Sequence, residues 1–96
     1  MVIVTGTVQV RPESLAEAIA LSVEHVHRSR AEPGCISHHV HQDVEDPCRL
    51  FFYERWHDRA ALDAHFTVPE SGRFVTALGG LSAARPAMEI HEVPEG

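Results

Sequence analysis

The sequence predicts a small α+β domain, on two observations. The chain has 96 residues, which support one modest core, so residues 1–96 are expected to form a single domain. Hydrophobic periodicity changes along the chain between two and about 3.6 residues, in the order strand, helix, strand, strand, helix, strand. That order is the split β-α-β, ferredoxin-like arrangement, an antiparallel sheet with helices on one face.

The composition excludes several classes of function. Hydrophobic residues make up 44% and charged residues 23%, a balance that argues against disorder. The net charge of −6 suits neither nucleic acid nor an anionic membrane, and without lysine no lysine Schiff base can form. No stretch approaches the roughly 20 apolar residues of a bilayer span, and nothing resembles a secretion signal. With two isolated cysteines, Cys35 and Cys48, we expect a reduced, cytoplasmic protein that binds neither nucleic acid nor membrane.

The first half of the chain is expected to form a strand and a helix. Residues 2–10 carry valine at four even-numbered positions, which predicts a half-buried strand. Pro12 and Glu13 then lead into a helix from Leu15 to about Arg30, which ends at the Pro33-Gly34 turn. The stripe predicted to be buried consists of Leu15, Ile19, Ser22, Val23 and Val26.

Two strands are expected next, over residues 35–43 and 49–57. The second is rich in aromatic residues and carries large apolar groups on both faces. Helices of the same chain can cover one face, but the other needs a second cover, and a second copy of the chain is the simplest one. The predicted helix-side residues are Leu50, Phe52, Glu54 and Trp56, and Phe51 and Tyr53 are candidates for the dimer contact.

The last third is expected to contain helical segments and a final strand. Asp58 is a plausible N-cap for a helix through Leu62, His65 and Phe66, which Pro69 interrupts. A short helical segment follows, with Phe74, Leu78 and Leu81 at helical spacing, and Gly79-Gly80 is expected to close it. The last strand is expected over residues 87–93.

The histidine run at positions 38–41 raises the question of a metal site. Strand alternation places His39 and His41 on one face and His38 on the other, so at most two could share an ion locally. No carboxylate or thiol completes a known zinc spacing. We therefore predict no metal site and expect partly solvated strand histidines, whose roles the sequence leaves open. Glycine-rich phosphate loops and serine nucleophile elbows are also absent.

One group of residues has spacing that suits acid–base chemistry. Glu54 and Trp56 are two apart on a strand and project the same way, and His65 follows on the next helix at the edge of its buried stripe. There a neutral imidazole could remove a proton near pH 7, with Glu54 orienting it. Trp56 and Phe52 would form a flat apolar wall for an aromatic ligand. The same spacing also fits a boundary histidine beside a core tryptophan.

Four motifs together resemble the antibiotic biosynthesis monooxygenase family, over nearly the whole chain. They are Glu32-Pro-Gly-Cys-Ile, Asp43-x-x-Asp46-Pro, Phe52-Tyr-Glu-x-Trp56 and Asp58-Arg-Ala-Ala-Leu-Asp-Ala-His65. The resemblance implies a homodimer in which two sheets pack into an α/β barrel, with a small-molecule pocket in each subunit. It also implies an oxygenase that uses molecular oxygen on a hydroquinone-like or polycyclic aromatic substrate, without flavin, metal or haem.

On this resemblance, His65 is the candidate base and Glu54 supports it as the second catalytic residue. The residues expected to bind substrate are Phe52, Trp56, Phe66, Arg73 and Phe74. No cofactor is expected. Haem-degrading members of the superfamily have a different pattern, because the position matching their iron-ligating histidine lies near Val75 here.

Two alternatives remain open at this point. A related group processes small phosphorylated sugars or autoinducer-type molecules as isomerases, and Arg73 beside Ser71 could serve such a substrate. The fold is also widely reused, so a non-catalytic small-molecule-binding dimer is the other alternative.

Overall fold

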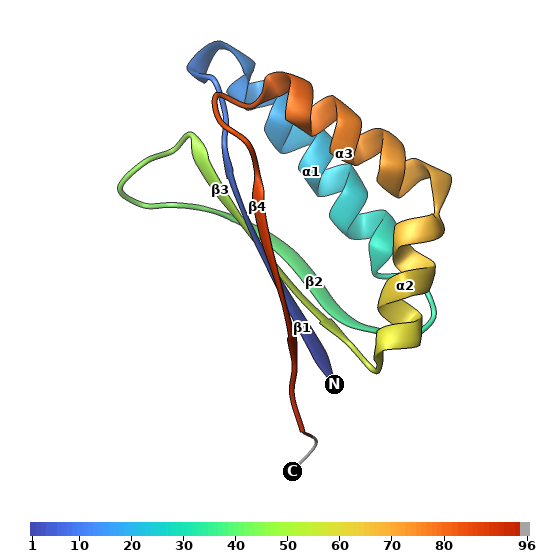
Figure 1. Ribbon diagram of the computed structural model, residues 1–96. Helices are drawn as coiled ribbons and strands as arrows, with labels where there is room; N and C mark the ends of the chain where they lie inside the picture. The colour runs from blue at the N-terminus through green and yellow to red at the C-terminus, as the bar shows by residue number, and fades with distance from the viewer. Residues whose placement is uncertain (95–96) are drawn as a thin grey trace.

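The computed structural model describes residues 1–94 and has the predicted α+β architecture. Four strands and three α-helices follow one another in a ferredoxin-like order (Figure 1). The elements are β1 (Val2–Gln9), a short 3₁₀ turn (Pro12–Ser14), α1 (Leu15–Ser29), β2 (Cys35–Gln42), β3 (Arg49–Trp56), α2 (Arg59–Thr67), α3 (Pro69–Leu81) and β4 (Ala87–Glu92).

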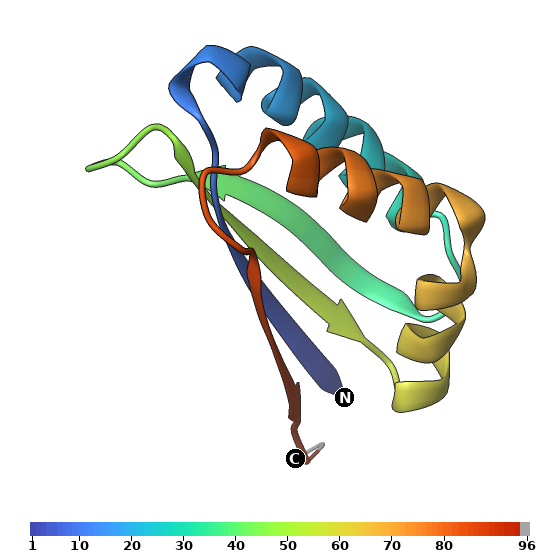
Figure 2. The same ribbon diagram turned by 45° about the horizontal axis from the view of Figure 1, so that its top comes forward.

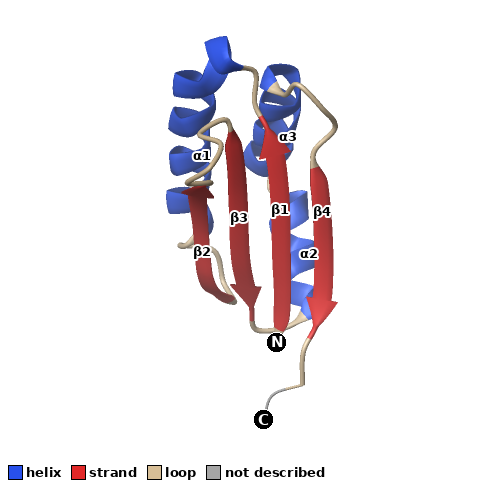
Figure 3. Cartoon of the chain, turned by 90° about the vertical axis from the view of Figure 1, so that its left-hand side faces the viewer, coloured by secondary structure: helices blue, strands red, loops and turns tan. Residues whose placement is uncertain are grey.

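The strands form one antiparallel sheet in the order β2-β3-β1-β4 (Figure 3). All three helices cover the same face of this sheet, and the described chain leaves the opposite face uncovered (Figures 1 and 2). In the two central strands, Val4 pairs with Glu54 and Gly6 with Phe52, so these residues point toward the helices side by side. Among the described residues, no helix combines the length and apolarity that crossing a membrane requires.

The alternation predicted for β1 and β3 is confirmed by burial. The four even-numbered valines of residues 2–10 are at most 4% exposed, as are Leu50 and Trp56. The buried apolar side chains form two clusters, one at each end of the sheet. The first contains Val8, Val10, Ala18, Val26, Leu50, Phe52 and Leu78, and the second contains Val2, Val4, Trp56 and Leu62.

Helix α1 buries most of the predicted stripe, since Ser22 and Val26 are buried and Leu15 and Ile19 pack against the core, but it differs at one position. Val23, expected inside, is 39% exposed, whereas His25 is only 5% exposed. Helix α1 packs against both β2 and α3, and its backbone can approach these elements closely only where its side chains are small. Apolarity alone therefore does not decide which face of α1 is buried. That face carries small residues and one histidine, namely Ala18, Ser22, His25, Val26 and Ser29.

Helix α3 continues through Gly79 and Gly80 to Leu81, so the expected helix stop at these glycines is wrong. The helix end is stabilised from elsewhere in the chain, because the Arg11 guanidinium donates to the carbonyl oxygens of Gly80 (2.7 Å) and Ser82 (3.1 Å). The turn expected at Gly34 is confirmed. Gly34 has φ of 83° in the turn between α1 and β2, a conformation that favours glycine.

Candidate active site

A cavity of about 590 Å³ lies between the helix-covered face of the sheet and the helices α2 and α3. Its walls are mainly apolar, with a few polar groups, which is typical of a small-molecule site. The lining residues are Val4, Gly6, Val8, His25, Phe52, Glu54, His65, Phe66, Ser71, Gly72, Phe74, Val75, Leu78, Gly79, Arg85, Pro86, Ala87 and Met88.

Of the residues expected to bind substrate, Phe52, Phe66 and Phe74 line this cavity and two others do not. Trp56 is fully buried behind the wall, where its indole ring packs 4.7 Å from the imidazole of His65, measured between ring centroids. Arg73 is exposed on α3 and pairs with Glu70 at 3.2 Å. Neither of these two side chains, which were expected to bind substrate, lines the cavity.

His65 is held at the cavity wall by a carboxylate that is distant in sequence. Its Nδ1 lies 2.8 Å from Oε1 of Glu32, in the turn after α1, and the His65 side chain is only 4% exposed. An ionised carboxylate can only accept, so Nδ1 donates, and in the neutral form of the ring the lone pair is on Nε2. The carboxylate that hydrogen-bonds to His65 is thus Glu32, and Glu54, which was expected to orient this imidazole, makes no hydrogen bond to it among the described residues.

Glu54 instead organises the side chains around His65. Its Oε1 accepts a hydrogen bond from Trp56 Nε1 at 2.9 Å and lies 3.3 Å from His38 Nε2. Burial alone raises the pKa of Glu54, but the adjacent His38 and the indole N–H outweigh burial, and the pKa lies below its ordinary value. An anionic carboxylate therefore borders the cavity and holds the indole that packs on His65.

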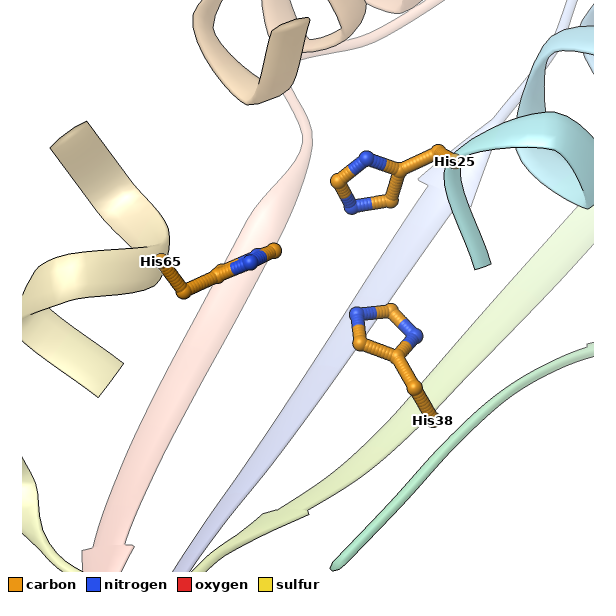
Figure 4. A group of neighbouring side chains, drawn as sticks. All are labelled: His25, His38 and His65. Carbon is orange, nitrogen blue, oxygen red and sulfur yellow. The ribbon is translucent and has the colours of Figure 1, made fainter. Parts of the chain in front are cut away.

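Three buried histidines from three elements converge beside the cavity (Figure 4). They are His25 of α1, His38 of β2 and His65 of α2, and one nitrogen of each lies within 4.8 Å of the others. His38 is fully buried, which corrects the expectation that it is partly solvated. Within the described residues 1–94, this is the group with spacing compact enough to consider as metal ligands.

The contacts of His25 argue against a metal in this arrangement. Arg28 Nη2 lies 2.8 Å from His25 Nδ1, and a guanidinium can only donate, so Nδ1 accepts. The neutral ring then carries its proton on Nε2, the nitrogen that would have to offer a lone pair to an ion. Burial lowers the pKa of His25 to about 3, helped by repulsion from His38, His65 and Arg28, so the ring is neutral at physiological pH.

Sequence reasoning missed Glu32 and His25 as site residues. Glu32 was visible only as part of a motif, and its partner lies 33 positions away. His25 had a weak signal, because it lies three positions after Ser22 and seven after Ala18, on the stripe of small residues that α1 buries. Its ring also stacks on Phe74, with centroids 4.0 Å apart.

Residues 1–77 match the model of the family described as antibiotic biosynthesis monooxygenase. The chain belongs to this family. An uncharacterized protein of Synechocystis is 37% identical over 94 residues, which cover 98% of this chain and 64% of that protein. The chain thus spans less than two thirds of the length of this relative.

Solved structures of the same fold include an antibiotic biosynthesis monooxygenase with a TM-score of 0.91. It is 27% identical, and the match covers 99% of this chain and 100% of that one. A candidate antibiotic biosynthesis monooxygenase from Deinococcus radiodurans has a TM-score of 0.94 at 27% identity, over 100% of this chain and 95% of its own. A protein of Mycobacterium tuberculosis, 25% identical, has a TM-score of 0.91 over 99% and 96% of the two chains.

Proposed function

We propose that the protein is a cofactor-independent monooxygenase that acts on a small aromatic or quinol-type substrate with molecular oxygen. The observation that carries this proposal is the Glu32–His65 pair. In the neutral form of the ring, this pair leaves the unprotonated Nε2 of His65 at the wall of an apolar cavity of about 590 Å³. Membership in the monooxygenase family supports the same reaction class.

The chemistry requires little from the protein beyond a base, orientation and exclusion of water. Nε2 of His65 removes the proton of an aromatic hydroxyl, and the resulting electron-rich anion reduces oxygen. One oxygen atom then enters the substrate, and the other leaves as water with two hydrogens that the substrate loses. Glu32 stabilises the imidazolium that forms on His65, since its carboxylate accepts from Nδ1–H.

The aromatic side chains suit a planar substrate. Phe52 and Phe74 line the cavity with ring centroids 5.9 Å apart in an edge-on arrangement, and Phe66 contributes from α2. Glu54 acts as a positioning residue in this proposal. Its hydrogen bond fixes Trp56, whose indole supports the ring of His65 from behind.

We also propose that the protein works as a homodimer through the uncovered sheet face. Phe51 is 39% exposed on that face, and Tyr53 and Arg55 of the same strand are partly exposed beside it. A second sheet would cover these side chains, which belong to a central part of the sheet where solvent exposure of aromatic residues is unfavourable. Sedimentation velocity of the wild type and of Phe51→Asp tests this contact, and a monomeric wild type contradicts it.

Oxygen consumption tests the proposed reaction. Wild-type protein is incubated with a panel of hydroquinones and dihydroxynaphthalenes, beside His65→Ala, Glu32→Gln and the matched control His57→Ala, which changes an exposed histidine. We expect the wild type and the control to consume oxygen, His65→Ala to lose at least 10²-fold in rate, and Glu32→Gln to lose less. Turnover that survives in His65→Ala contradicts the proposal.

The same assay separates the two alternatives. Hydroquinone binding without oxygen consumption indicates a non-catalytic binding dimer. The phosphosugar alternative relied on Arg73, which lies outside the cavity beside Glu70. Binding that depends on a phosphate group would still favour it over the monooxygenase.

A further inference from the structure

We infer that His25 is a second catalytic residue, whose Nε2–H donates a hydrogen bond to the substrate oxygen from which His65 takes the proton. The inference rests on the proposed function and deepens it. It also defines the substrate class, which is a compound with a phenolic or enolic hydroxyl that fits between two neutral imidazoles.

The neighbours of the two rings set opposite tautomers. Arg28 donates to Nδ1 of His25 at 2.8 Å, so the proton of that ring is on Nε2. Glu32 accepts from Nδ1 of His65 at 2.8 Å, so in the neutral form of that ring Nε2 is unprotonated. The pair therefore offers one acceptor and one donor, and both residues line the cavity.

The spacing of the rings fits a single oxygen atom between them. The ring centroids of His25 and His65 are 5.4 Å apart, and one nitrogen of each lies within 4.8 Å of the other. An oxygen at about 2.8 Å from both nitrogens can bridge a separation of up to about 5.6 Å. Figure 4 shows a nitrogen of His25 directed into the gap that His65 also faces.

This arrangement suits the change of charge during the reaction. A hydroxyl first donates to Nε2 of His65 and accepts from Nε2–H of His25. When its proton moves to His65, the oxygen becomes an anion and the bond from His25 becomes charge-assisted, which strengthens it. His25 keeps its plane because it stacks on Phe74 at an interplanar angle of 5°, so the donor is positioned before the substrate binds.

Glu54 cannot replace His25 in this role, because a carboxylate has no proton to donate when ionised. Its negative charge at the cavity wall instead disfavours an anion nearby. Stabilisation of the anion must then come from a donor such as His25.

The ionisation of bound 4-nitrophenol tests the inference without turnover, because the phenolate absorbs visible light and the phenol does not. The apparent pKa of the probe is measured on the wild type and on four variants. His25→Phe removes the donor but keeps a flat ring on Phe74, and His25→Gln restores a donor. Arg28→Leu removes the donor that keeps the proton of His25 on Nε2, whereas Arg28→Gln retains a donor toward Nδ1.

We expect the wild type to lower the pKa of bound 4-nitrophenol relative to that of the free probe. His25→Phe should raise the bound value by about one to two pK units, with His25→Gln in between. Arg28→Leu should raise it and Arg28→Gln should not, a contrast that a merely structural role of Arg28 would not produce. Circular dichroism establishes that each variant is folded.

Three results overturn the inference. They are equal probe pKa values on the wild type and a folded His25→Phe, no binding of 4-nitrophenol at millimolar concentration, and stoichiometric Zn²⁺ binding that His25→Phe abolishes. The last result would mean that Nε2 of His25 carries a lone pair. A shifted probe pKa without oxygen consumption contradicts only the monooxygenase proposal. Oxygen consumption with an unchanged probe pKa in His25→Phe contradicts only the role of His25.

Discussion

Acidification from pH 7 to pH 5 should destabilise the protein through His25, well before its carboxylates become protonated. The folded-state pKa of His25 is lowered from 6.5 to about 3, chiefly because the side chain is buried. Between these two values, the unfolded chain binds a proton at this position and the folded chain does not. The stability that neutral His25 provides is therefore complete above pH 6.5 and is lost as the pH falls toward 3.

The magnitude follows from the width of this window. Each pH unit below 6.5 lowers the free energy of unfolding by about 1.4 kcal/mol. The decrease from pH 6.5 to pH 5 spans about 1.5 units and therefore lowers it by about 2 kcal/mol. Glu54 acts in the same direction, but its folded-state pKa lies below the ordinary value of 4.5. Its contribution is present above pH 4.5 and is lost only in more acidic solution.

Urea unfolding at pH 7 and pH 5, at one protein concentration, measures the effect. The wild type should lose about 2 kcal/mol more than His25→Phe, whose phenyl ring can keep the stack on Phe74 but cannot be protonated. The difference between the two proteins removes the contributions of the remaining titrating groups. Equal losses in the two proteins would refute the argument that His25 is buried and neutral.

Three further substitutions test the packing and turns that position the site. Leu62→Ala should cost about 2–5 kcal/mol in urea unfolding, because this fully buried side chain packs in the cluster with Trp56; a cost under 1 kcal/mol would contradict that packing. Gly34→Ala should lower the thermal midpoint, since φ is positive and the new Cβ would clash with Ala61; an unchanged midpoint would show that the turn differs. Asp58→Ala should cost about 1 kcal/mol of unfolding free energy, because it removes the N-cap bond to Ala61 N–H (2.8 Å), whereas Asp58→Asn should cost less.

The sheet could be predicted from the sequence because strand side chains alternate with a period of two. Alternation alone separated Leu50 and Trp56 from Phe51 and Tyr53, and burial agrees for each of the four. The buried face of α1 was harder to predict. A histidine among small residues scores as polar, yet His25 is buried because packing against β2 and α3 selects that side of the helix.

The site was predicted only in part, because its contacts join residues that are distant in the chain. Helical and strand spacing singled out His65 and Phe52, whereas Phe66 and Phe74 were expected on the family resemblance. The hydrogen bond between Glu32 and His65 depends on how the turn after α1 meets α2, which no local pattern encodes. Spacing also shows which way Trp56 projects but not how far the cavity extends, so it could not reveal that the indole lies behind the cavity wall.

The opposite tautomers of His25 and His65 can be observed by ¹⁵N NMR of the histidine side chains. Coupling between ring nitrogens and ring protons at pH 7, with His25→Phe and His65→Ala spectra for assignment, distinguishes protonated from unprotonated nitrogens. We predict a proton on Nε2 of His25 and on Nδ1 of His65. The same tautomer in both rings, or a proton on Nε2 of His65, would contradict this prediction.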